Sequence, residues 1–231
     1  MLQDIAIAAD EWFLEIDTVS REQGPWSVAA HLPTEARYLP SARSIALPSV
    51  VSPPILMAAF TASLKEYLIE ELGPTPACDV DLAWLRRQYP PSLRPAVSAP
   101  HNWHQDGAYG FDFTDEKLSL DDALVPMLTL WAPLQACGEL APGLELVANP
   151  DHRLIDLPSL EENEISKRWP YDQRWRPVMK PGDVLLIKSH VLHRTHVTSH
   201  MTQVRSCVEL RFFPAQSIPL RMASHTFVAM V

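Results

Sequence analysis

Two histidines and an aspartate are the residues of this sequence whose types and spacing best fit a chemical site. His104 and Asp106 stand two positions apart in the stretch 101–107 (HNWHQDG), and His193 follows much later, after a strand-like run. In a β-strand, side chains at i and i+2 project from the same face, so an imidazole and a carboxylate would enter one cavity together. Two histidines and one carboxylate on one face of a metal, with the opposite positions open, form the facial triad of non-haem Fe(II) chemistry.

The His-x-Asp triplet is weak evidence by itself. The chain has nine histidines, so such a triplet arises often by chance, and two polar residues at the end of a strand would be the plain alternative. Iron chemistry with a 2-oxo acid needs more than a triplet, because the acid and O2 must share the open face of the metal. If the acid is 2-oxoglutarate, its far carboxylate needs a cation. Arg205 opens the strand after His193 and could supply it, with Arg211 on the same strand face as the reserve candidate.

Composition and charge exclude several classes of function. The net charge is −9 and no basic run occurs, which argues against nucleic acid as a partner. No apolar run approaches the ~20 residues that a membrane span needs, and the acidic N-terminus does not resemble a signal peptide. The three cysteines (Cys78, Cys137 and Cys207) form no CxxC pair, which favours a reducing compartment. We therefore expect a cytoplasmic protein with a small-molecule substrate, and its oligomeric state stays open.

The elements that must position these residues are mostly short strands. The sequence has 22 prolines and only 7 glycines, which suits many loops and sheet edges. Apolar spacing predicts a short helix over 1–16 and a longer one over 53–72, ended by Gly73-Pro74. Strand patterns follow at 80–86, 125–134, 144–147, 184–187 and 204–213. We expect a mainly β fold with flanking α-helices, a double-stranded β-helix (a cupin-like jelly roll). One domain over 1–231 would have a helical and irregular front at 1–75 and a β-helix core at 80–213.

The sequence resembles the phytanoyl-CoA dioxygenase family of Fe(II)/2-oxoglutarate-dependent oxygenases. The resemblance covers about residues 80–213 and depends on the joint occurrence of several short motifs. These are WHQDG at 103–107, LWAPL at 130–134, APG at 141–143, PGDV at 181–184, LHR at 192–194 and Arg205 at the start of the last alternating strand. By that resemblance His104, Asp106 and His193 would bind iron, and Arg205 would bind the distal carboxylate of 2-oxoglutarate.

Other polar residues near these motifs have weaker assignments. Thr129 is expected to line the pocket as a cofactor-binding residue, while Trp131 is assigned to the core. Alternation along a strand predicts that His101 faces away from His104. His190, His196 and His200 are expected in loops.

Arg86 and Gln88 share a strand face upstream of the site and could contact substrate or co-substrate. The stretches 107–124 and 149–178 are predicted to be long loops, and the first is of a kind that often covers a site.

The resulting hypothesis is an Fe(II)/2-oxoglutarate-dependent dioxygenase. It would use O2, convert 2-oxoglutarate to succinate and CO2, and hydroxylate an unactivated C–H bond of a small molecule. The carboxylate of Asp106 favours hydroxylation over halogenation, since iron halogenases of this class have a small residue there. Two alternatives remain open. One is a cupin-like isomerase or hydrolase that uses Zn or Mn and does not need Arg205; the other is a non-catalytic small-molecule-binding relative.

Overall fold

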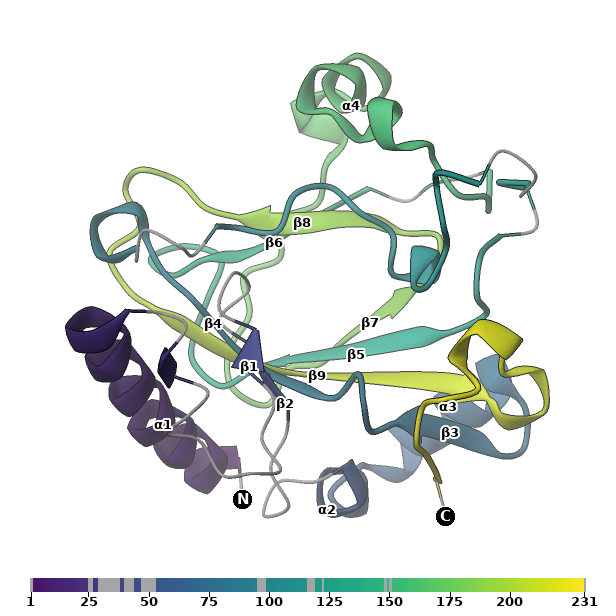
Figure 1. Ribbon diagram of the computed structural model, residues 1–231, viewed down its shortest axis with the longest axis horizontal. Coiled ribbons are helices and arrows are strands. Elements are labelled where there is room, and N and C mark those ends of the chain that lie inside the picture. Colours follow the sequence, from purple (N-terminus) through teal and green to yellow (C-terminus); the bar gives the residue numbers. More distant parts are fainter. Residues whose placement is uncertain are drawn as a thin grey trace.

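Two antiparallel sheets face each other in this protein, with helices packed outside the larger one (Figure 1). The computed structural model describes residues 2–24, 27–28, 38–39, 44–46, 53–94, 99–115, 119–121, 123–147, 149 and 151–230. The helices are α1 (Leu2–Gln23), α2 (Pro53–Ala58), α3 (Ala62–Leu72) and α4 (Glu162–Arg168). The predicted mainly β fold with flanking α-helices is confirmed.

The larger sheet is built around its longest strand, β9 (Arg205–Pro214). Among the described residues this sheet has eight strands. On one side β9 pairs first with β4 (Trp84–Gln88) and then with β3 (Pro76–Asp79), and on the other side it pairs with β5 (Leu128–Pro133). The sheet is completed by β1 (Tyr38–Leu39), β2 (Ser44–Ala46), β7 (Leu185–Lys188) and β10 (Phe227–Ala229).

The smaller sheet pairs β6 (Gly143–Val147) with β8 (Leu192–His196) and lies opposite the larger one in Figure 1. Its edges are extended by two short backbone contacts. His104 forms an isolated bridge with His193 of β8, and Trp175 forms one with Leu146 of β6. The space between the two sheets is therefore bounded on one side by the segment that carries the His-x-Asp triplet.

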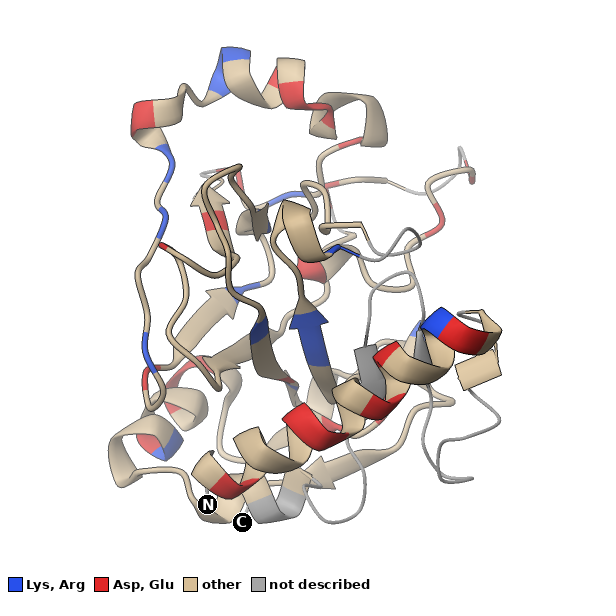
Figure 2. Ribbon diagram, turned by 90° about the vertical axis from the view of Figure 1, so that its left-hand side faces the viewer, with Lys and Arg blue, Asp and Glu red and all other residues tan. Residues whose placement is uncertain are grey.

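The N-terminal helix α1 covers the outer face of the larger sheet. Its apolar side is buried at four helically spaced positions, Ile5, Ala9, Phe13 and Ile16, and packs into the main core cluster. The helix runs on to Gln23, beyond the end predicted at residue 16. Figure 2 shows acidic residues recurring along the helix, and one of them, Asp10, pairs with Arg87 on β4.

The predicted helix over 53–72 is two helices. α2 ends at Ala58 and α3 begins at Ala62, where the Thr61 side chain accepts a hydrogen bond from Leu64 N at 3.2 Å. Threonine is a good N-cap, so the chain can restart a helix there despite the continuous apolar stripe. The predicted end is confirmed, since Gly73 has a positive φ of 89° that favours glycine.

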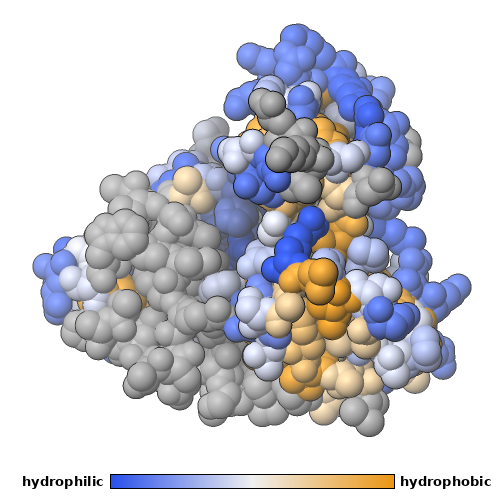
Figure 3. Space-filling model, turned by 45° about the vertical axis from the view of Figure 1, so that its right-hand side comes forward, coloured by the Kyte–Doolittle hydropathy of each residue, from blue (hydrophilic) through white to orange (hydrophobic). Residues whose placement is uncertain are grey.

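Other differences from the predicted elements also have local or tertiary causes. The strand expected at 80–86 starts later, at Trp84, because Asp79 Oδ1 accepts hydrogen bonds from the N–H groups of Asp81 and Leu82 and makes a turn. β3 and β10 lie outside the predicted core boundaries and were not expected. The loop predicted at 149–178 contains α4, which stands apart at the top of Figure 1, where the surface in Figure 3 is mostly hydrophilic.

Candidate active site

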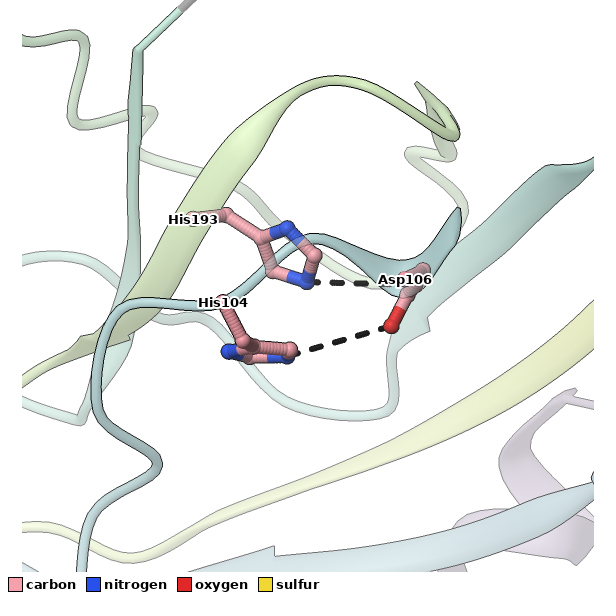
Figure 4. A group of neighbouring side chains, drawn as sticks. All are labelled: His104, Asp106 and His193. Carbon is pink, nitrogen blue, oxygen red and sulfur yellow. Dashed lines mark ion pairs between the residues drawn. The ribbon is translucent and has the colours of Figure 1, made fainter. Parts of the chain in front are cut away.

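The structure brings His104, Asp106 and His193 together, as the sequence predicts. His104 and His193 exchange two backbone hydrogen bonds of 3.0 Å, and Asp106 opens the short 3-10 turn Asp106–Ala108. The distance from His104 Nε2 to Asp106 Oδ1 is 3.8 Å, and the distance from His193 Nε2 to Asp106 Oδ2 is also 3.8 Å. One ligand atom from each residue lies within 4.8 Å of the others. Figure 4 shows the three side chains pointing toward one another.

Backbone carbonyls orient both imidazoles. His104 Nδ1 lies 2.7 Å from Asn102 O, and His193 Nδ1 lies 3.1 Å from Val191 O. A carbonyl only accepts, so each Nδ1 carries the proton and donates it. Each Nε2 then keeps its lone pair free on the side that faces Asp106, which is the arrangement of metal-binding histidines.

The Asp106 carboxylate is held by two donors from the larger sheet. The Thr129 hydroxyl on β5 donates to Asp106 Oδ2, and Arg211 Nη2 on β9 lies 3.5 Å from Asp106 Oδ1. Burial by itself would raise the pKa of this carboxyl, but the Arg211 guanidinium and the two imidazoles outweigh it, so the pKa is lowered. Burial, with His193 beside it, lowers the pKa of His104 to about 3. At neutral pH the site therefore offers an ionised carboxylate and a neutral imidazole, the forms that bind a metal.

The donor set of this site suits iron. Two imidazole nitrogens and one carboxylate oxygen match the facial triad of non-haem Fe(II) sites. A second group in the described residues, Asp79, Asp81 and His225, also brings potential ligand atoms within 4.8 Å. There, however, Asp79 Oδ2 is bonded to His225 Nδ1 at 2.6 Å, and Asp81 Oδ2 accepts from Thr226 N. Those contacts tie the C-terminal segment to the end of β3, so that group has a structural explanation.

The two candidate arginines lie on the same face of β9 but meet different partners. Arg205 is 1% exposed; its Nε donates to Pro142 O at 3.2 Å, and its guanidinium lies 5.0 Å from the centre of the Trp131 ring. Arg211 instead donates to Leu82 O and faces Asp106. The buried Trp131 Nε1–H has no hydrogen-bond partner among the described residues. Arg205 thus lies beside an unused donor, whereas the guanidinium of Arg211 faces the candidate metal ligand.

Gln88 and Thr129 line the same cavity as the triad and the two arginines. Gln88 pairs in register with Arg205 across β4 and β9, so their side chains lie on the same face of the sheet. Thr129 lies in the pocket as expected, and its hydroxyl is directed at the Asp106 carboxylate. Its predicted contact with the cofactor stays a prediction.

The prediction that His101 faces away from His104 is wrong. The two ring centres lie 5.3 Å apart, and the His101 ring contacts Arg86 Nη1 at 3.0 Å. The alternation rule fails because residues 101–105 do not form a regular strand and make only a single bridge at His104. His196 is the last residue of β8 rather than a loop residue, while His190 and His200 lie in turns as expected.

Glu209, which lies on the same face of β9 as Arg205 and Arg211, was assigned no role from the sequence. Glu209 Oε2 lies 2.9 Å from Arg86 Nε and 3.4 Å from Arg211 Nη2. The alternation of Arg205, Cys207, Glu209 and Arg211 along the strand was the signal for this shared face. The pairing with Arg86 comes from the adjacent strand, which the alternation of one strand does not reveal.

A jelly roll with two imidazoles and one carboxylate around one position, and buried arginines beside it, defines a class of metal-dependent oxygenases. The model of the phytanoyl-CoA dioxygenase (PhyH) family matches residues 9–202, and the chain belongs to this family. Its members are Fe(II)/2-oxoglutarate-dependent enzymes, so the expected class of enzyme and its cofactors, iron and 2-oxoglutarate, are confirmed. Which residues hold these cofactors stays a prediction.

Solved structures of this class share the fold at low sequence identity. EctD from S. alaskensis with bound Fe has a TM-score of 0.59 and 16% identity over 88% of this chain and 69% of that chain. The α-ketoglutarate-dependent epimerase SnoN from nogalamycin biosynthesis has a TM-score of 0.50 and 14% identity over 82% of this chain and 69% of its own. Another match, EvdMO1, has 21% identity and a TM-score of 0.44 over 68% of this chain, which spans about a third (32%) of that protein. The EctD and SnoN structures confirm the expected jelly-roll fold.

A search of curated protein sequences finds no significant match. Within the described residues, no helix is both long enough and apolar enough to cross a membrane.

Proposed function

We propose that this protein is a dioxygenase that hydroxylates a small-molecule substrate, converting 2-oxoglutarate and O2 to succinate and CO2. One oxygen atom of O2 enters the substrate C–H bond and the other enters succinate. The observation that carries the proposal is the convergence of His104 Nε2, His193 Nε2 and an Asp106 oxygen within 4.8 Å. The two backbone contacts at Nδ1 support it, because they turn both Nε2 lone pairs toward the same position.

Iron bound by these three residues would supply the binding position for the 2-oxo acid and the oxygen chemistry. The chain itself would position the co-substrate. Arg205 offers a guanidinium for the distal carboxylate, with Gln88 beside it on the same sheet face. The buried Trp131 Nε1–H has no partner among the described residues, and leaving such a donor unpaired costs about 1–3 kcal/mol. A carboxylate oxygen in this part of the cavity would accept from it.

Asp106 supports hydroxylation as the outcome, since its carboxylate would occupy the metal position that a halide needs in halogenases of this class. The ligands bound in the structurally similar proteins support a small molecule as substrate. One EctD structure contains 2-oxoglutarate and 5-hydroxyectoine, and one SnoN structure contains nogalamycin RO. Those ligands are properties of EctD and SnoN, and the substrate of this chain is a separate question.

A cytoplasmic location is part of the same proposal. The three cysteines are buried and unpaired. Burial raises the pKa of Cys78 and of Cys207 to about 12, so both stay protonated thiols at neutral pH. Unpaired thiols in all three positions fit a reducing compartment.

The proposal is tested by an anaerobic titration of the metal-free protein with Fe(II) and then with 2-oxoglutarate. The expected result is a saturable visible charge-transfer band from iron to the 2-oxo acid. The band should be lost in His104→Ala and retained in His200→Ala, a matched control whose histidine is exposed and lies in a turn outside the site. Stoichiometric iron binding without a band would reject 2-oxoglutarate as co-substrate. A response to zinc or manganese in its place would favour an isomerase or hydrolase.

A further inference from the structure

The wall of the cavity carries an unusual number of buried charges. Besides Asp106, the charged side chains Arg86, Arg205, Glu209 and Arg211 line it, and each is at most 9% exposed. Arg194 also lines the cavity but turns toward Glu145 and Glu162 outside it. Buried charges are costly unless they are paired, so the balance among these five groups constrains what else can bind.

The carboxylates of the cavity pair with only two of the three arginines. Glu209 lies between Arg86, at 2.9 Å, and Arg211, at 3.4 Å, while Asp106 lies 3.5 Å from Arg211. Arg205 has no carboxylate partner among the described residues and contacts Pro142 O, the Cys207 sulfur and the Trp131 ring. Among the cavity-lining residues that the structure describes, three guanidiniums against two carboxylates leave one positive charge.

Binding of Fe(II) and 2-oxoglutarate would not remove that positive charge. Fe(II) brings two positive charges and 2-oxoglutarate brings two negative ones, so they cancel. A third ligand with one negative charge would bring the cavity to neutrality. A neutral ligand would leave the charge buried, an amine would add to it, and a phosphate, with a charge of about −1.5 to −2, would exceed it.

The geometry offers two separate places for anionic groups. Arg86 pairs in register with Cys207, one same-face step along the sheet from the pair of Gln88 and Arg205. The two guanidiniums therefore come from diagonal neighbours, whose Cα atoms are typically about 7–8 Å apart. Arg86 Nε lies 2.9 Å from Glu209 Oε2 as an ion pair but, although buried, has no hydrogen-bond partner among the described residues, and Nη1 contacts the His101 ring. One guanidinium can bind the distal carboxylate of 2-oxoglutarate while the other remains available.

We infer that the substrate is a small molecule with a single carboxylate, which Arg86 binds beside the iron while Arg205 holds 2-oxoglutarate. This inference rests on the proposed function and names the substrate class of the same site. Arg86 is then a specificity-determining residue, and Glu209 moderates its charge. Because Glu209 pairs with both Arg86 and Arg211, its negative charge lowers the affinity of the cavity for an anion.

The test uses the anaerobic complex with Fe(II) and 2-oxoglutarate. It is titrated with three matched pairs of probes, namely acetate and acetamide, benzoate and benzamide, and 3-phenylpropionate and 3-phenylpropionamide. Binding is read from the shift of the charge-transfer band and by calorimetry. At least one carboxylate should bind at least tenfold more tightly than its amide. If no carboxylate binds at least tenfold more tightly than its amide, or if none binds at all, the inference is overturned.

Variants at two positions test whether the charge of the cavity wall sets the affinity for the carboxylate probes. Arg86→Gln should weaken the carboxylate probe at least tenfold while the Kd for 2-oxoglutarate changes less than twofold. Glu209→Gln should move the carboxylate affinity in the opposite direction, because it removes a negative charge. The matched control is Arg87→Gln, since Arg87 is on the same strand but pairs with Asp10 and Ser206 on the outer side. Arg87→Gln should leave the affinities of both carboxylate and 2-oxoglutarate unchanged.

The failure of this inference differs from the failure of the proposed function. If the charge-transfer band never forms, the proposed function is wrong. If the band forms normally but Arg86→Gln weakens 2-oxoglutarate and spares the carboxylate probes, Arg86 belongs to the co-substrate and only the inference about the substrate is overturned.

Discussion

Replacing Thr129 by valine should destabilise the metal-free protein through a single hydrogen bond. Valine keeps nearly the same shape and removes the hydroxyl that donates to Asp106 Oδ2. Thr129 is 2% exposed and Asp106 is 8% exposed, so water does not readily replace the lost donor. A hydrogen bond to a charged group contributes about 1.5–3 kcal/mol, and we expect the free energy of unfolding to fall by about 2 kcal/mol at pH 7.

The pH dependence of this effect follows from the lowered pKa of Asp106. A carboxyl with a folded pKa below its unfolded value of about 3.9 adds stability above that value and loses it as pH falls toward the folded pKa. Thr129→Val makes the depression of the pKa smaller. The difference between wild type and variant should therefore stay constant from pH 8 to pH 5, where Asp106 is ionised in both folded proteins.

The assay is urea unfolding in EDTA, arranged as a double-mutant cycle with Asp106→Asn. A charged hydrogen bond is roughly twice as strong as a neutral one, so the valine substitution should cost about 1 kcal/mol less in the Asn background. Independent sites add to within about 0.5 kcal/mol. Additive effects of the two substitutions would refute the assignment of the Thr129 hydroxyl to the charged carboxylate.

Three more predictions follow from particular contacts. Gly107→Ala should lower the free energy of unfolding by about 1–3 kcal/mol and weaken Co(II) binding. A Cβ there, next to Asp106, would lie 2.5 Å from Leu124 Cδ2 and 2.9 Å from Ser189 O. A variant with the Tm and the Co(II) affinity of the wild type would contradict this. Phe13→Ala, which removes a fully buried ring of α1, should cost about 3–5 kcal/mol in urea unfolding. Leu14→Ala, at a 66% exposed position, is its control, and equal costs would show that α1 does not pack as described. Arg211→Met should destabilise the protein in EDTA by about 3–5 kcal/mol, because Asp106 and Glu209 lose their shared cation. Added Co(II) should then raise the Tm more than in wild type, and an equal rise would argue against electrostatic coupling between Arg211 and the metal position.

Local covalent geometry explains what the sequence predicted of the site. Side chains two residues apart in extended backbone point the same way, which placed His104 with Asp106 and put Arg205 and Arg211 on one face of β9. The end of the second predicted helix at Gly73 was equally local, because a positive φ favours glycine. These features need only the preferences of a few neighbouring residues.

Features that depended on pairing between distant segments were not accessible in this way. The addition of β3 and β10 to the sheet was not predicted, because both strands pair with residues far away in the sequence. The break between α2 and α3 and the helix α4 were also missed, although the Thr61 cap that begins α3 is a local feature. His101 was misplaced because its segment makes one bridge to β8 rather than a regular strand.

The sequence by itself indicated the kind of chemistry. Two imidazoles, one carboxylate and an arginine on an alternating strand together favour an iron site that binds a 2-oxo acid. Only the tertiary structure shows which partner each arginine contacts. The register between β9 and its neighbours directs Arg211 to Asp106, leaves Arg205 beside Trp131, and joins Arg86 to Glu209. Register between strands is set by packing of the whole sheet, because shifting a strand by one residue would turn every one of these side chains to the opposite face.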